Sequence, residues 1–240
     1  MKVVMCARRC VSVSLLLSVS VAGTLSAQMG LGAASRVTYG VILGANAASV
    51  SETFQAIKDL AGAAVSTKRR VGLNGGIYIN ASLLGGVSLQ PEAHYSQTGV
   101  TYDVKALGNN PTTGSASLKM DYVEVPVLLR LDLGKKASHL HPFVYAGAGG
   151  AFRISCEIGS TVNTTTVKKA CTENTTSTSK DPIEKYDVSA IGGGGFSISG
   201  FGRSYSLSGR YTRGLSKITT ETTGAAPKNS VFSVQLGIGF

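Results

Sequence analysis

The segment 122–133, YVEVPVLLRLDL, alternates between two kinds of side chain. One row of alternate positions is entirely apolar, and the other carries two acids and a base. The apolar row is Val123, Val125, Val127, Leu129, Leu131 and Leu133, and the other is Tyr122, Glu124, Pro126, Leu128, Arg130 and Asp132. Side chains of a β-strand point alternately to opposite faces, so the segment predicts a strand with one apolar face.

The same alternation recurs along the chain. Its clearest instance is the final segment, where the apolar row is Phe232, Val234, Leu236, Ile238 and Phe240. Weaker instances are diluted by glycine, which makes up 30 of the 240 residues. Together they predict eight strands, near residues 37–46, 70–80, 84–97, 118–133, 142–155, 186–199, 204–215 and 230–240.

The connections between these segments alternate in length. Long ones cover about 47–69, 98–117, 156–185 and 216–229, and short ones cover about 81–83, 134–141 and 200–203. Outer-membrane barrels have short periplasmic turns and longer external loops. The pattern therefore predicts an all-β, eight-stranded antiparallel up-and-down transmembrane β-barrel. A soluble barrel with hydrated polar residues outside is the alternative, because alternation alone does not say which face is outward.

Charged residues within the strands favour the membrane alternative. They lie in the polar rows of their strands and include both acids and bases, so they can form ion pairs inside a narrow barrel. The charged residues are Glu92, Glu124, Arg130, Asp132, Asp187 and Arg210, and the polar residue Gln235 lies in the same kind of row. An eight-stranded barrel is just wide enough for side chains to fill it. We therefore expect a packed, non-conducting lumen in which Arg130 pairs with Glu124 or Glu92, with a small pore as the alternative.

Aromatic residues lie toward the ends of the strands. Tyr95, Phe143, Tyr205, Tyr211 and Phe240 are placed as interfacial girdles require, whereas Tyr145 falls on the polar row. The first long connection differs from the others, because Ser49 and Glu52 match a capping box and apolar residues follow at helical spacing. It predicts a short amphipathic helix, with an irregular loop as the alternative.

The N-terminus has the features of a secretory signal. A basic start is followed by an apolar run too short to span a membrane and by the sequence LSAQ, so we expect cleavage after Ala27. Residues 1–27 are then the signal peptide and 28–240 the barrel domain; an uncleaved anchor is the alternative. Cleavage removes three positive charges and no acid, so the formal net charge falls from +10 to +7.

Cleavage also leaves Cys156 and Cys171 as the two cysteines of an exported chain, which predicts a disulfide. These cysteines flank a Thr-rich tract typical of a solvated loop. Two cysteines are too few for a metal site, and the three histidines lie far from them in the sequence, so we expect no metal.

Sequence signatures of catalysis are largely absent. The glycine-rich segments GAGGAF and GGGGFS match neither G-x-G-x-x-G nor a Walker motif, and the common hydrolase and redox motifs do not occur. We expect no cofactor and no enzymatic activity. One alternative stays open: Glu92, His94 and Ser96 share a strand face, and His-x-Ser also occurs in lipid A deacylases, which implies a lipid-modifying hydrolase.

The predicted external loops are rich in lysine and arginine. A basic rim attracts phosphates of outer-membrane lipids or an anionic partner through screened electrostatics, although a merely solvated loop surface is an equal alternative. Nucleic acid is a poor candidate because basic and aromatic residues are not interleaved.

Several segments together resemble a known family. VSLQPEAHYSQTGV, DYVEVPVLLRL, PFVYAGAGGAF, RYTRGL and NSVFSVQLGIGF are similar, in that order, to segments of the PorT-like outer-membrane β-barrel family. The final strand, which ends at Phe240, resembles the signal read by the barrel-assembly machinery. The resemblance implies an eight-stranded barrel in the bacterial outer membrane, and it also allows a role in secretion or assembly. Our leading hypothesis is a structural or binding role, through external loops that contact lipid, a protein or a glycan. It supplies no catalytic residues.

Overall fold

A computed structural model describes residues 37–50, 63–106, 113–133, 140–162, 165–171, 184–218 and 228–240. The expected signal segment 1–27 lies outside these residues. Within them, no helix is long and apolar enough to cross a membrane.

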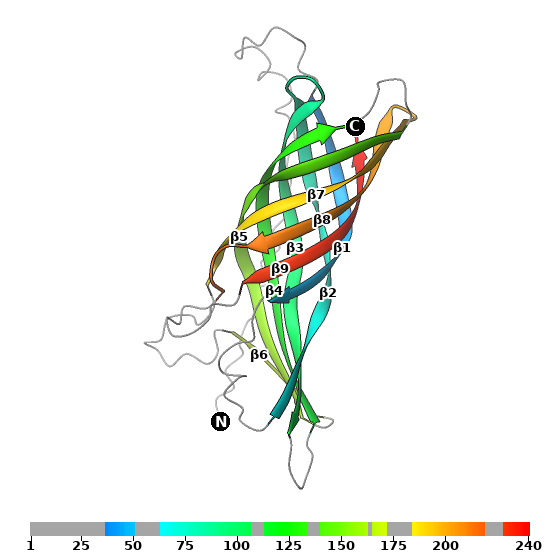
Figure 1. Ribbon diagram of the computed structural model, residues 1–240. Helices are drawn as coiled ribbons and strands as arrows, with labels where there is room; N and C mark the ends of the chain where they lie inside the picture. Colours follow the sequence, from blue (N-terminus) through cyan, green and yellow to red (C-terminus); the bar gives the residue numbers. More distant parts are fainter. Residues whose placement is uncertain are drawn as a thin grey trace, which may run out of the picture. The chain divides into compact units, whose positions relative to one another are not determined.

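The described residues form nine strands (Figure 1). They are β1 (Val37–Val50), β2 (Ala63–Ser82), β3 (Val87–Ala106), β4 (Thr113–Asp132), β5 (Leu140–Val162), β6 (Thr165–Ala170), β7 (Tyr186–Gly200), β8 (Arg203–Gly214) and β9 (Asn229–Gly239). The eight predicted strands are therefore confirmed.

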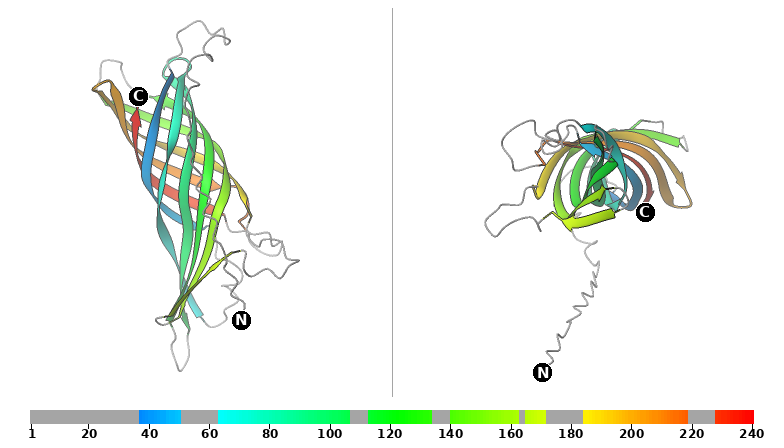
Figure 2. Two further views of the ribbon diagram at one scale, coloured as in Figure 1. Left: turned by 180° about the vertical axis from the view of Figure 1, so that it is seen from behind. Right: turned by 90° about the horizontal axis from the view of Figure 1, so that it is seen from below.

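Eight of these strands close into an antiparallel barrel. Each pairs with its neighbour in the order β1–β2–β3–β4–β5–β7–β8–β9, and β9 pairs with β1 to complete the ring. The strands run obliquely around a common axis (Figure 1 and Figure 2). β6 stands outside the ring and forms a hairpin with the outer end of β5.

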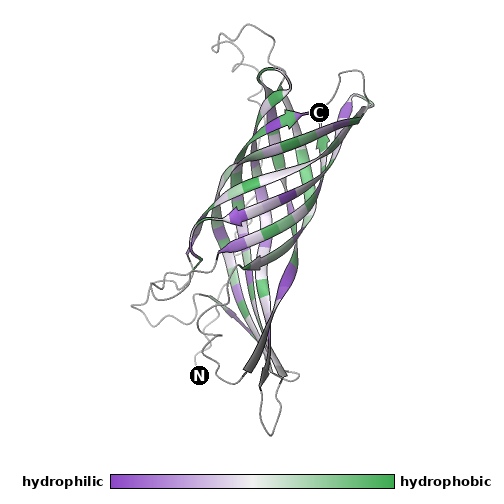
Figure 3. Cartoon of the chain, in the orientation of Figure 1, coloured by the Kyte–Doolittle hydropathy of each residue, from purple (hydrophilic) through white to green (hydrophobic). Residues whose placement is uncertain are grey.

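Apolar side chains cover the outer surface of this barrel. The predicted apolar row of β4 is exposed along its length, with Leu129 at 56%, whereas Leu128 on the other row is fully buried. The apolar row of β9 behaves in the same way, with Leu236 at 62%. Figure 3 shows apolar positions recurring along the strands. A continuous exposed apolar belt of this size is what a lipid-facing wall requires.

The strands extend further than the sequence predicted on the side of the long connections. Much of the segment 98–117 is strand, because β3 runs to Ala106 and β4 begins at Thr113. The outward row there gives no apolar signal, because its positions carry Gln97, Gly99, Thr101 and Asp103. The inward row continues unbroken, and both Thr98 and Val100 are buried.

The predicted amphipathic helix is wrong at both ends. Ser49, the expected helix cap, belongs to β1 and pairs with Ser230, while Ala64 belongs to β2 and pairs with Lys105. Backbone hydrogen bonds to neighbouring strands outweigh the local helical pattern at these positions. Residues 51–62 between them lie outside the described residues.

The Thr-rich tract also begins as regular structure. β5 continues to Val162 and pairs with β6, so this predicted loop starts with a hairpin whose residues Thr165–Ala170 are all exposed. The sequence missed this hairpin because threonine and lysine side chains give no apolar alternation.

Two tight turns join strands at the opposite end of the barrel. Gly85 and Gly86 have positive φ values of 59° and 88° in the β2–β3 turn, and Phe201 and Gly202 have values of 54° and 73° in the β7–β8 turn. Positive φ at both central residues matches the twist of a hairpin. We call the other end, which carries the long connections and β6, the external end, because short turns face the periplasm in outer-membrane barrels.

The aromatic residues only partly match the predicted girdles. Tyr95, Tyr205, Tyr211 and Phe240 are exposed on the outer wall, as expected. Phe143 is 4% exposed and lies in the lumen, which corrects its predicted outward position. Phe143 lies two residues before Tyr145, so both side chains point to the same face of β5.

Candidate functional site: the lumen

A buried ion pair crosses the middle of the lumen. Glu92 comes from β3 and Arg210 from β8, which lie on opposite sides of the eight-stranded ring. The Nη2 atom of Arg210 donates to Oε1 and Oε2 of Glu92 at 2.9 and 2.7 Å. The Glu92 side chain is fully buried and that of Arg210 is 5% exposed. This contact ties together two walls of the barrel that share no backbone hydrogen bonds.

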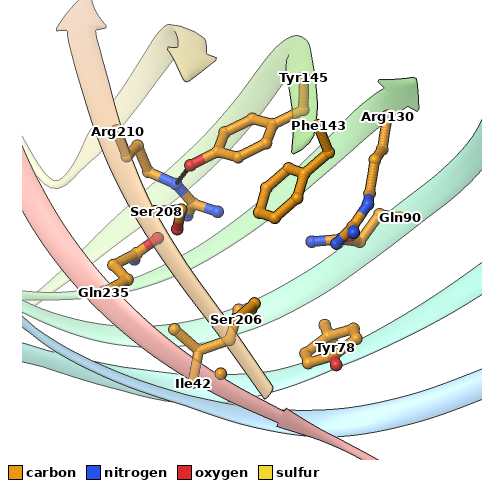
Figure 4. A pocket seen from close by; sticks show the side chains of 11 residues that line it. Ile42, Tyr78, Gln90, Arg130, Phe143, Tyr145, Ser206, Ser208, Arg210 and Gln235 are labelled. Carbon is orange, nitrogen blue, oxygen red and sulfur yellow. Dashed lines mark hydrogen bonds between the residues drawn. The ribbon is translucent and has the colours of Figure 1, made fainter. Parts of the chain in front are cut away.

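Further polar groups complete the surroundings of this pair. Gln90 donates from Nε2 to Glu92 Oε1 at 2.6 Å, and His94 Nε2 lies 2.8 Å from Glu92 Oε2 without the geometry of a directed hydrogen bond. Arg210 Nε donates to the Tyr145 hydroxyl at 3.4 Å, as the dashed line in Figure 4 shows. Buried charges are costly unless they are paired and hydrogen-bonded, and here they are both.

Arg130 does not join this ion pair. It donates from Nε and Nη2 to Asp132 Oδ1 at 3.1 and 2.7 Å, and its guanidinium lies 3.8 Å above the ring of Phe143. The predicted pairing of Arg130 with Glu124 or Glu92 is therefore wrong. Asp132 lies two residues away on the same strand face, and the inward ring of Phe143 holds the guanidinium near that end of the barrel.

Glu124 and Asp187 lie elsewhere in the lumen. With Tyr122 and Asn229 they line a cavity of about 20 Å³, and Asn229 Nδ2 donates to Asp187 Oδ2 at 3.0 Å. The six charged residues that the sequence grouped together thus occupy three places: the central ion pair, the Arg130–Asp132 pair and this cavity.

A network of uncharged residues lies beside the central ion pair and was not predicted. Asn46 Nδ2 donates to Ser96 Oγ at 3.0 Å, Ser233 Oγ donates to Asn46 Oδ1 at 2.8 Å, and Asn74 Nδ2 donates to the same oxygen. Gln235 Nε2 then donates to Asn74 Oδ1 at 3.1 Å. Each of these residues occupies one of the alternate strand positions whose side chains point into the lumen. That alternation is the sequence signal that could have identified them.

An apolar cluster closes the lumen toward the external end. Its buried members are Val50, Val100, Tyr102, Leu118, Met120, Tyr122, Cys171 and Ile218. We call this group the apolar cap. Cys171 is 1% exposed and is joined to Cys156 by the predicted disulfide, which the structure confirms. The sequence did not predict an apolar group inside the barrel, because the strand expected at 84–97 ended before Val100 and Tyr102.

Little free space is left between these groups. The cavity drawn in Figure 4 has a volume of about 20 Å³ and is lined by Tyr78, Arg130, Phe143, Tyr145 and Arg210, among others. That is room for about one water molecule. Among the described residues, no group of three His, Cys, Asp or Glu side chains could hold a metal ion.

The row of Glu92, His94 and Ser96 that the hydrolase alternative requires is only partly connected. Glu92 and His94 are in contact, but the Ser96 hydroxyl accepts a hydrogen bond from Asn46. All three side chains are buried inside the barrel, each at 5% exposure or less. A lipid substrate at the outer wall would not reach them.

Comparison with known proteins places the chain in a family. The family model described as outer membrane protein beta-barrel domain matches residues 26–220. The chain belongs to this family. It is therefore an outer-membrane β-barrel protein, and the apolar outer belt is its lipid-facing wall. No curated protein matches it.

Solved structures with a similar fold have little sequence in common with this barrel. Neisserial surface protein A has 11% identity and a TM-score of 0.41, covering 85% of this chain and 97% of its own. The attachment invasion locus protein of Yersinia pestis, solved with the heparin analogue sucrose octasulfate, has 9% identity and a TM-score of 0.37, covering 85% and 99%. OprG from Pseudomonas aeruginosa has 11% identity and a TM-score of 0.38, covering 85% and 94%.

Proposed function

We propose that this outer-membrane barrel is non-conducting and acts as a binding protein through its external end. The groups that fill the lumen support the first half of this proposal. The Glu92–Arg210 pair crosses the barrel, and the apolar cap lies between that pair and the external end. An ion on its way through would have to break a buried ion pair and then cross an apolar layer, and both steps are unfavourable.

The β5–β6 hairpin supports the second half. β5 is the longest strand, and its outer end pairs with β6, all of whose residues are exposed. Lys168 and Lys169 lie on this hairpin, and Lys168 Nζ is 3.7 Å from Glu157 Oε1. The disulfide holds the base of the hairpin in place, so little conformational entropy is lost when a partner binds. We propose that the partner is anionic.

Conductance of the refolded barrel tests the closed lumen. We expect no unitary currents in a planar bilayer from protein whose folding is verified by heat-dependent gel mobility. A porin reconstituted in parallel would show that the assay detects insertion. Stable unitary currents from the folded barrel would contradict a closed lumen.

Binding to a polyanion tests the external hairpin. We expect the refolded protein to be retained on immobilised dextran sulfate and the K168Q/K169Q variant to elute at lower salt, because two exposed charges are lost. R203Q is the matched control, since Arg203 lies at the β7–β8 turn at the other end of the barrel. Equal elution of K168Q/K169Q and the wild type would remove the hairpin from the proposal.

A further inference from the structure

Two arginines lie on the outer wall at the external end, on strands separated by β9 and β1. Arg213 lies two residues from Tyr211 on β8, so both side chains point outward. Arg213 pairs with Ser230 of β9, and Ser230 pairs with Ser49 of β1. The next position along β1, Ala48, pairs with Arg70 of β2, which follows the exposed Arg69. Ser230 and Ser49 therefore lie between Arg213 and the Arg69–Arg70 segment of β2.

These arginines border the apolar belt. The adjacent row on the periplasmic side contains Tyr211, Phe232 and Val71, which are 47%, 48% and 74% exposed. On β9 the apolar belt runs from Phe232 to Phe240, a distance of about 27 Å along the strand. Because the strands of such barrels are tilted, this corresponds to about 20 Å along the barrel axis. That height approaches the ~25 Å of a membrane-spanning apolar band, so the arginines lie at its external border.

Neither arginine is neutralised by the described part of the chain. Within the described residues, no carboxylate lies at ion-pair distance from Arg69 or Arg213, whereas nearby Lys68 contacts Asp103 at 2.5 Å. The Tyr211 hydroxyl, two residues from Arg213 on the same face of β8, shares a hydrogen bond of 3.1 Å with Ser230 Oγ. Hydrogen-bonding hydroxyls and positive charge thus lie on the same wall at the lipid border.

We propose that Arg69 and Arg213, together with the hydroxyls of Tyr211 and Ser230, bind a phosphate group of an anionic lipid in the external leaflet. Guanidinium groups bind phosphate oxygens with paired, charge-assisted hydrogen bonds. The acyl chains of the same lipid would lie on Phe232 and Val71 directly below. This site rests on the location in the outer membrane and is independent of the proposed role of the β5–β6 hairpin.

Native mass spectrometry of the refolded full chain tests the site. The probe is bisphosphorylated lipid A, titrated into protein held in neutral detergent, with the same lipid after phosphatase treatment as the comparison. We expect the wild type to prefer the phosphorylated lipid and R69Q/R213Q to bind it about tenfold more weakly. The matched control R203Q/K217Q removes two exposed cations that lie in neither proposed binding site and should bind like the wild type.

Three results would overturn the proposal. One is equal binding of phosphorylated and dephosphorylated lipid by the wild type, and another is an equal loss in the control variant, which would indicate non-specific attraction. The third is displacement of the lipid by an equal concentration of inorganic phosphate, which would identify a free-anion site instead. Heat-dependent gel mobility must show that both variants are folded before their affinities are compared.

Discussion

At the scale of single residues, the centre of the lumen depends on complete pairing of its charges. Glu92 is surrounded by Arg210, His94 and Gln90, and its side chain is fully buried. A buried ion pair stabilises little compared with an apolar substitute, but breaking it leaves a charge that water cannot reach.

Replacing Arg210 with methionine should therefore destabilise the barrel by about 3–5 kcal/mol. The free energy of unfolding can be measured with urea and circular dichroism, since the chain has no tryptophan. The double variant E92L/R210M should recover much of the loss, because it removes both charges together. A double variant as unstable as the single one would show that the cost comes from packing, and R203M is the surface control.

Glycine in β7 provides space for the Tyr145 side chain. A Cβ atom on Gly193 would lie 2.4 Å from the carbonyl oxygen of Gly209 and 2.6 Å from the ring and hydroxyl of Tyr145, whereas one on Gly192 would meet nothing within 4 Å. We expect G193A to lose about 1–3 kcal/mol of stability through overpacking and G192A to lose much less. Urea unfolding of both variants measures the difference, and similar losses in the two would contradict this role of Gly193.

At the scale of elements, the β5–β6 hairpin is an addition to the barrel. β6 pairs only with β5 among the described strands, and the disulfide joins its end to Cys156. Closure of the ring needs β9 and β1, which are remote from the hairpin in the pairing order. The hairpin should therefore open without opening the barrel.

The variant C156S/C171S tests this independence. We expect faster amide hydrogen exchange in β6 and the outer end of β5, because a cross-link over a loop of this length contributes about 3 kcal/mol. The temperature at which the folded gel band disappears should shift little. Wild-type protein with a reducing agent should behave like the variant, and a large loss of barrel stability in either would show that the disulfide supports the whole ring.

At the scale of the whole molecule, two barriers lie in series along the axis. The polar network around Glu92 and Arg210 comes first from the periplasmic side, and the apolar cap follows. In the proposed closed lumen, each would block ions for a different physical reason, because one holds fixed paired charges and the other excludes water.

Removal of one barrier should leave the barrel closed. We expect E92A/R210A to be silent in a planar bilayer, and unitary currents to appear only when L118A and M120A are added. The folded gel band serves as the control for each variant. Currents from E92A/R210A alone would show that the cap does not block ions, and silence after all four substitutions would place the closure in other residues.

The sequence by itself determined much of the barrel. Strict alternation, as in 122–133 and 230–240, depends only on the period of the strand, and a single apolar row can face only lipid or a core. The number of barrel strands, the outward row and the cysteine pair could therefore be predicted locally.

The choice of partners was decided only by the tertiary structure. Glu92 and Arg210 are 118 residues apart, and their contact depends on strand tilt and register around the whole ring. The alternation along β4 shows that Arg130 points into the lumen, but it does not give the position of Arg130 along the barrel axis. That position brings its guanidinium to Asp132 and Phe143. The apolar cap likewise forms because β1, β3, β4 and the end of β6 converge at one level, which no single segment encodes.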